Sequence, residues 1–150
     1  MTYIQHTFLY FILLLNLFIF LIAWQQVKTK RTAFGLTRWL FPLGSFVWGD
    51  ALVFSVFWVL ASLSSLLLSD WLLFWLIFSV FWVVRSLGET QYWFNQQFAE
   101  KKLDAPESLL GYSIFQNHSI YFAYQIFWQC LAVAAIVGSV YVAWLWLGQM

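Results

Sequence analysis

Three ionisable residues lie within or beside long apolar stretches of the chain: Asp50, Arg85 and Glu89. A charge at the centre of a membrane-spanning helix costs about 2.5–3.5 kcal/mol on insertion scales, so such residues face inward, pair with one another and mark ion, proton or solute sites by default. Arg85 is placed to bridge both carboxylates, which leaves a net charge of −1 on the three side chains. A proton or a bound cation would balance that charge.

Other polar side chains extend this candidate site at helical spacing. Residues three or four positions apart share one face of an α-helix, and the face of Arg85 and Glu89 continues to Tyr92. The last apolar stretch carries a second polar face, and the first stretch holds one strongly polar interior residue at a matching depth. The candidate ligand- or ion-binding residues are Asp50, Arg85, Glu89, Tyr92, His118, Gln125, Gln129 and Asn16.

The sequence contains no pattern typical of a catalytic, metal or cofactor site. Zincin, nucleophile-elbow, phosphate-loop and dinucleotide-binding motifs are absent, and the single cysteine, Cys130, cannot supply the several thiolates of a zinc or iron–sulfur site. His6 and His118 are predicted near opposite membrane faces, so one chain cannot provide both axial ligands of a haem. We therefore expect no cofactor and no metal, and we assign no catalytic residue.

The composition predicts that the solvent of this chain is lipid. Of its 150 residues 63% are hydrophobic and 9% charged, whereas a soluble domain has about 45–50% apolar and about 25% charged residues. Seven Lys and Arg against six Asp and Glu give a net charge of +1, which excludes the basic surface that nucleic-acid binding requires. The expected partners are the lipid bilayer and either further copies of the chain or a membrane complex.

Four apolar stretches are long enough to approach the roughly 20 residues that a helix needs to cross the hydrocarbon. Between the last two, Asp104, Pro106 and Glu107 follow the pattern of a capped helix start. The sequence thus predicts one all-α transmembrane domain, a four-helix bundle with a short cytoplasmic interfacial helix. The expected spans are about 3–24, 46–68, 71–100 and 118–147, and the interfacial helix covers about 105–111.

The distribution of positive charge predicts the topology. Connections 25–45 and 88–118 contain or border all seven basic residues, namely Lys28, Lys30, Arg31, Arg38, Arg85, Lys101 and Lys102. Connections rich in Lys and Arg stay in the cytoplasm, so we expect both there and both termini outside. Only Ser69 and Asp70 separate the second and third stretches, which predicts a tight antiparallel hairpin on the outer side.

A structural interpretation of the polar residues stays open beside the ligand-site interpretation. Arg85 and Glu89 then form a helix-end pair whose side chains reach the interface, and Asp50 orients the start of the second helix. Gln125 and Gln129 make hydrogen bonds between helices.

Three functions remain open. The first is an oligomeric transporter or channel for an ion, a proton or a small polar solute. The alternative is a non-catalytic accessory or scaffold subunit of a larger membrane complex. The second alternative is a lipid-modifying or redox enzyme acting near Glu89 and His118.

Overall fold

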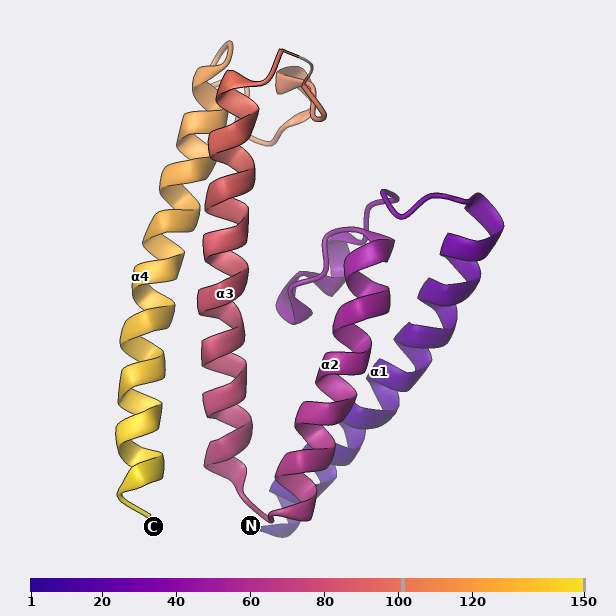
Figure 1. Cartoon of the computed structure of the whole chain (residues 1–150), viewed down its shortest axis with the longest axis vertical. Coiled ribbons are helices and arrows are strands. Elements are labelled where there is room, and N and C mark those ends of the chain that lie inside the picture. Colours follow the sequence, from indigo (N-terminus) through magenta and orange to yellow (C-terminus); the bar gives the residue numbers. More distant parts are fainter. Residues whose placement is uncertain (101, 150) are drawn as a thin grey trace. The chain divides into compact units, whose positions relative to one another are not determined.

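The computed structural model describes residues 1–100 and 102–149 and is all-helical over that part of the chain. Four α-helices are each long and apolar enough to cross a membrane, and two 3₁₀-helices lie in the connections (Figure 1). They are α1 (Tyr3–Lys30), η1 (Arg38–Leu43), α2 (Trp48–Leu67), α3 (Trp71–Phe98), η2 (Pro106–Ser108) and α4 (Ser119–Leu147). The chain divides into an N-terminal unit, Met1–Ile77, and a C-terminal unit, Phe78–Met150. Each is described by itself.

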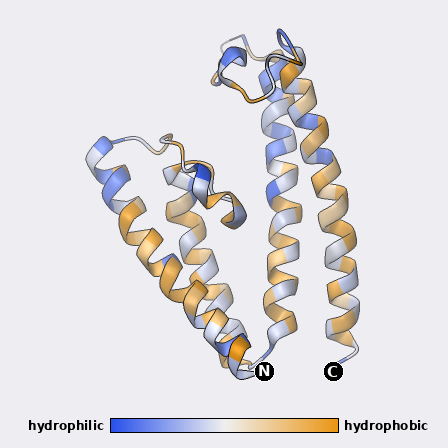
Figure 2. Ribbon diagram, turned by 180° about the vertical axis from the view of Figure 1, so that it is seen from behind, coloured by the Kyte–Doolittle hydropathy of each residue, from blue (hydrophilic) through white to orange (hydrophobic). Residues whose placement is uncertain are grey.

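Helix α1 extends beyond its apolar stretch. A capping box opens it: the Thr2 hydroxyl accepts the backbone N–H of Gln5 at 3.4 Å, and the Gln5 side chain accepts the N–H of Thr2 at 2.7 Å. The helix ends at Lys30, where Arg31 adopts a left-handed conformation with φ 49°. The helix thus extends beyond the expected membrane span of about 3–24, because residues 25–30 are mostly good helix formers. Figure 2 shows this last part of α1 as hydrophilic.

Helices α1 and α2 run antiparallel and side by side in the N-terminal unit (Figure 1). The face that α2 buries repeats every three or four residues and consists mainly of small side chains, which permit close helix approach. Its buried residues are Ala51, Ser55, Trp58, Ala61, Ser62 and Ser65. A tight turn follows α2: Ser69 takes φ 51°, and the Asp70 carboxylate accepts the N–H of Leu73 at 3.0 Å at the start of α3. The antiparallel pairing of the second and third helices stays a prediction.

The connection between α1 and α2 is folded, whereas the sequence suggested only a basic loop. Residues 31–47 form a hairpin, here called the loop hairpin, with an isolated antiparallel bridge between Leu36 and Val47. The N–H of Thr37 donates to the carbonyl of Phe46 at 2.8 Å, and η1 forms the tip. Because the hairpin occupies these residues, α2 begins at Trp48, two residues later than expected.

The C-terminal unit pairs the greater part of α3 with α4, and residues 99–118 connect them at one end (Figure 1). Helix α3 continues through Arg85 and Glu89 to Phe98, as the single long helix predicted from the sequence, two residues short of the expected end. Helix α4 begins at Ser119, one residue later than expected. Figure 2 shows α3 changing from hydrophobic to more hydrophilic along its length.

The predicted two-turn helix over residues 105–111 is wrong. Only the three-residue 3₁₀-helix Pro106–Ser108 forms, and turns follow it. The expected cap fails because the Asp104 carboxylate accepts a hydrogen bond from the Tyr92 hydroxyl at 2.5 Å instead of the first backbone N–H groups of a helix. Gly111 then takes φ 90°, a left-handed conformation that turns the chain.

Candidate functional site

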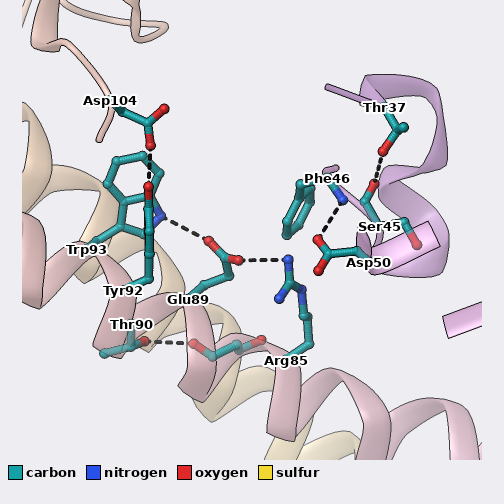
Figure 3. A network of polar contacts seen from close by, with 11 residues as sticks. Thr37, Ser45, Phe46, Asp50, Arg85, Glu89, Thr90, Tyr92, Trp93 and Asp104 are labelled. Carbon is teal, nitrogen blue, oxygen red and sulfur yellow. Dashed lines mark hydrogen bonds and ion pairs between the residues drawn. The ribbon is translucent and has the colours of Figure 1, made fainter. Parts of the chain in front are cut away.

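The ion pair between Arg85 and Glu89, which the sequence predicted toward the cytoplasmic end of the third span, forms within the C-terminal unit. Arg85 Nη2 lies 2.8 Å from Glu89 Oε1, and the two side chains are 16% and 13% exposed. The other carboxylate oxygen, Glu89 Oε2, accepts the indole N–H of Trp93 at 3.1 Å (Figure 3). Both oxygens of Glu89 are therefore engaged from its own helix, and the pair carries no net charge.

Asp50 has a structural contact in the N-terminal unit. It is the third residue of α2, and its Oδ2 accepts the backbone N–H of Phe46 at 3.1 Å (Figure 3). The sequence placed this side chain about five residues inside the helix; it lies in the first turn, where it joins the helix start to the base of the loop hairpin. This contact agrees with the structural interpretation of Asp50. The predicted bridge from Arg85 to Asp50 remains a prediction.

Tyr92 and Asp104 anchor the connection between α3 and α4, although the sequence pattern suggested that Asp104 caps a helix. Asp104 accepts from the Tyr92 hydroxyl through its carboxylate and from the Tyr121 hydroxyl through its backbone carbonyl. Tyr124 donates to the carbonyl of Leu110 at 3.1 Å. Three tyrosines on two helices thus hold the connecting segment. A signal for this existed in the sequence, because all three lie close to the ends of helices that a single connection joins.

The backbone and side chains at the C-terminal end of α3 form hydrogen bonds with Lys102 and Leu103, which the sequence did not predict. The Lys102 ammonium donates to the carbonyls of Gln96 at 2.5 Å and Gln97 at 3.0 Å, and the Gln96 side chain accepts the N–H of Leu103 at 3.2 Å. A cation here satisfies the last carbonyl groups and opposes the negative end of the helix dipole. These contacts are typical of a helix stop.

An aromatic cluster joins the C-terminal part of α3 to the start of α4. Trp93 is buried, and its ring centroid lies 6.1 Å from that of Tyr121 and 4.6 Å from that of Tyr124. His118 is exposed and stacks on Tyr121 at 5.9 Å. Aromatic pairs at such distances stabilise packing beyond the area they bury. His118 therefore belongs to the outer edge of this cluster.

The two glutamines of α4 differ in their surroundings. Gln125 Oε1 accepts a hydrogen bond from Gln97 Nε2 at 2.5 Å, so the predicted link between helices forms there. Gln129, one turn further along, is exposed and makes no hydrogen bond with the described residues. It is the eleventh residue of α4, ~15 Å from the start of the helix.

Asn16 belongs to the interface between α1 and α2. It is 1% exposed, and its amide donates to the carbonyl of Ile12 at 2.8 Å. On the facing helix the hydroxyl groups of Ser62 and Ser65 are buried without a hydrogen-bond partner among the described residues. This interface is thus partly polar along its length.

Within residues 1–100 and 102–149, no group of three or more His, Cys, Asp or Glu side chains is arranged to hold a metal ion. Cys130 is exposed on α4. Comparison with models of protein families, with curated proteins and with solved structures finds nothing that matches this chain.

Proposed function

We propose that the chain is an integral membrane protein whose four helices cross the bilayer, and that it acts as a non-catalytic scaffold subunit of a membrane assembly. Seven basic residues in or beside two connections support a cytoplasmic place for those connections and an outer place for both termini. The turn around Pro106–Ser108 then lies on the cytoplasmic side, near the headgroups.

Gln129 is the observation that carries the assembly. Its amide is exposed on α4 at a depth that the hydrocarbon would occupy, and lipid tails offer it no hydrogen bond. Amide side chains at such positions make hydrogen bonds between helices, each stabilising association by about 0.6–2 kcal/mol. An amide both donates and accepts, so the same amide on a second copy complements it. We therefore infer self-association through the outer face of α4.

The contacts of the other polar residues support a structural role for them. Glu89 is held by Arg85 and Trp93, Asp104 by two tyrosines, and Gln125 by Gln97. Such contacts fix helix ends and connections. In this account they give the subunit a rigid framework on which the apolar exterior of α4 is presented.

Native mass spectrometry of the detergent-purified protein tests the assembly, with two matched glutamine substitutions. Gln129→Leu is expected to weaken self-association about three- to thirty-fold, because it removes the exposed amide. Gln125→Leu, one turn away on the same helix, removes an amide already paired within the chain and should leave the subunit number unchanged. A monomeric wild type, or equal effects of both substitutions, would refute the proposal.

A second candidate function rests on the charges of α3. Arg85 and Glu89 are poorly exposed in the same helix, and ionisable groups within a membrane commonly line transport pathways. Transport of an ion or a proton predicts that Glu89→Gln or Asp50→Asn abolishes flux in proteoliposomes while Glu107→Gln, an exposed carboxylate, does not. Wild-type protein without flux would exclude this candidate.

A further inference from the structure

Backbone groups of the loop hairpin are hydrogen-bonded within the hairpin and to side chains of α2, and non-helical chain at membrane depth requires such partners within the protein. At its base the N–H of Trp48 donates to the carbonyl of Gly35 at 3.0 Å, and the N–H of Gly49 donates to the carbonyl of Ala33 at 2.9 Å. At its tip Gly44 N–H donates to Phe41 at 2.8 Å. The buried Thr37 hydroxyl donates to the carbonyl of Ser45 at 3.2 Å (Figure 3).

The tip of the hairpin lies beside the apolar parts of α1 and α2. Leu40 packs in one buried cluster with Ile19 and Ala23 of α1 and with Ala51 of α2. Both α1 residues precede the polar segment that begins at residue 25. The hairpin therefore runs back along the helices, toward the depth of their apolar residues.

Two contacts place the tip between the levels of Ala51 and Trp58 on α2: Leu40 packs in the cluster that contains Ala51, and a hydrogen bond joins Leu43 to Trp58. The indole N–H of Trp58 donates to the carbonyl of Leu43 at 3.0 Å. Trp58 is the eleventh residue of α2, ~15 Å along the axis from its start. Helix α2 has 20 residues, a length of ~30 Å that equals the hydrocarbon thickness. With α2 across the bilayer, the tip enters the hydrocarbon from the side of the basic connection.

The outer surface of the hairpin combines exposed apolar rings with cations. Trp39 is 59% exposed and Phe41 44% exposed. Four basic side chains around the hairpin are exposed and form no ion pair with the described residues: Lys28, Lys30, Arg31 and Arg38. Asp50 is the one carboxylate in this half of the N-terminal unit, and its Oδ2 accepts the N–H of Phe46. This surface therefore carries positive charge that anionic groups at the membrane interface would neutralise.

We propose that the loop hairpin is a re-entrant element that binds the headgroup of an acidic phospholipid in the cytoplasmic leaflet. Trp39 and Phe41 contact the acyl chains, while Arg31 and Arg38 reach the phosphate. The planar guanidinium donates two parallel hydrogen bonds to phosphate oxygens, and long basic side chains extend to the interface from an apolar segment. The inference rests on the proposed membrane placement and is independent of the proposed self-association.

Lipid retention tests the binding. The purified protein is equilibrated with equimolar phosphatidylglycerol and phosphatidylcholine, and native mass spectrometry counts each retained lipid. We expect wild type to prefer the acidic lipid. Near a membrane surface each cation strengthens the attraction about five-fold, so Arg31→Gln with Arg38→Gln should lower the preference about 25-fold. The control, Arg31→Lys with Arg38→Lys, keeps the charges and most of the preference. Equal retention of both lipids by wild type, or an unchanged preference in the glutamine variant, would overturn the proposal.

A depth measurement tests the insertion without relying on those substitutions. In a Cys130→Ala background, a nitroxide label is attached at Trp39→Cys in the hairpin or at Ser113→Cys, an exposed position in the other cytoplasmic connection. We expect the label at position 39 to be relaxed by oxygen and shielded from a water-soluble nickel complex, and the label at 113 to show the reverse. Equal access of the nickel complex to both labels contradicts the re-entrant hairpin.

Discussion

Trp58 Nε1 lies 3.0 Å from the carbonyl oxygen of Leu43, and this hydrogen bond joins the tip of the loop hairpin to the middle of α2. Trp58 itself is 1% exposed. The indole therefore supplies the Leu43 carbonyl with a donor from outside the hairpin, at a position buried within the protein.

Replacing Trp58 with Phe should free the hairpin tip. Phe keeps most of the apolar ring but leaves the Leu43 carbonyl without its donor, which costs about 1–3 kcal/mol for a buried group. The free energy of unfolding, measured by titration with a denaturing detergent, should fall by that amount. Trp144→Phe is the control, because Trp144 is 68% exposed on α4 and should leave stability unchanged.

Breaking the pair on α3 should be more harmful than removing it entirely. Glu89→Gln removes the carboxylate that Arg85 Nη2 contacts at 2.8 Å, and loss of one partner of a buried pair costs about 3–5 kcal/mol. The double replacement Arg85→Met with Glu89→Leu should recover most of the lost stability, since apolar substitutes for a buried pair are often tolerated. If the double variant were as unstable as the single one, the pair would have a role beyond mutual neutralisation.

Tyr92→Phe should loosen the connection between α3 and α4. The substitution removes the hydroxyl that donates to Asp104, a hydrogen bond to a charged group that stabilises by about 1.5–3 kcal/mol. Hydrogen exchange of amides in residues 102–118 should accelerate, while amides in the loop hairpin keep their wild-type rates. Tyr112→Phe, which changes another tyrosine of the same segment, serves as the control and should have little effect.

The helices were predictable from the sequence, and their ends were not. Apolar runs place all four helices, and α3 continues through its charged pair because Arg85 and Glu89 support each other within one turn. Helix ends depend on hydrogen bonds that hydropathy does not report. Residues 25–30 continue α1 although they are mostly polar. At the start of α2, the side chain of Asp50 accepts the backbone N–H of Phe46.

The candidate site was predictable only where partners lie on one helix. The contact between Arg85 and Glu89 follows from their spacing. Asp104 was interpreted as a helix cap, and only the fold of the connection brings it to Tyr92 and Tyr121. Likewise the pairing of Gln125 with Gln97, and the exposure of Gln129, depend on the rotation of α4 against α3, which a single apolar helix does not encode.

Labelling from each side of the membrane tests the topology. In a Cys130→Ala background, single cysteines at Thr32 and Ser113 should react with an impermeant maleimide only from the cytoplasmic side. A cysteine at Leu68, in the exposed turn after α2, should react only from outside. The positive-inside distribution of Lys and Arg is the reason for this expectation. Reaction of all three positions from one side would contradict four complete spans.

Photo-crosslinking in native membranes tests self-association through α4 most directly. A photoreactive residue is placed at position 129 or, as the matched control, at position 125, and the products are identified by mass spectrometry. We expect position 129 to give a covalent dimer linked α4 to α4, and position 125 to give products within one chain. Products of position 129 that contain only lipid would contradict the scaffold account.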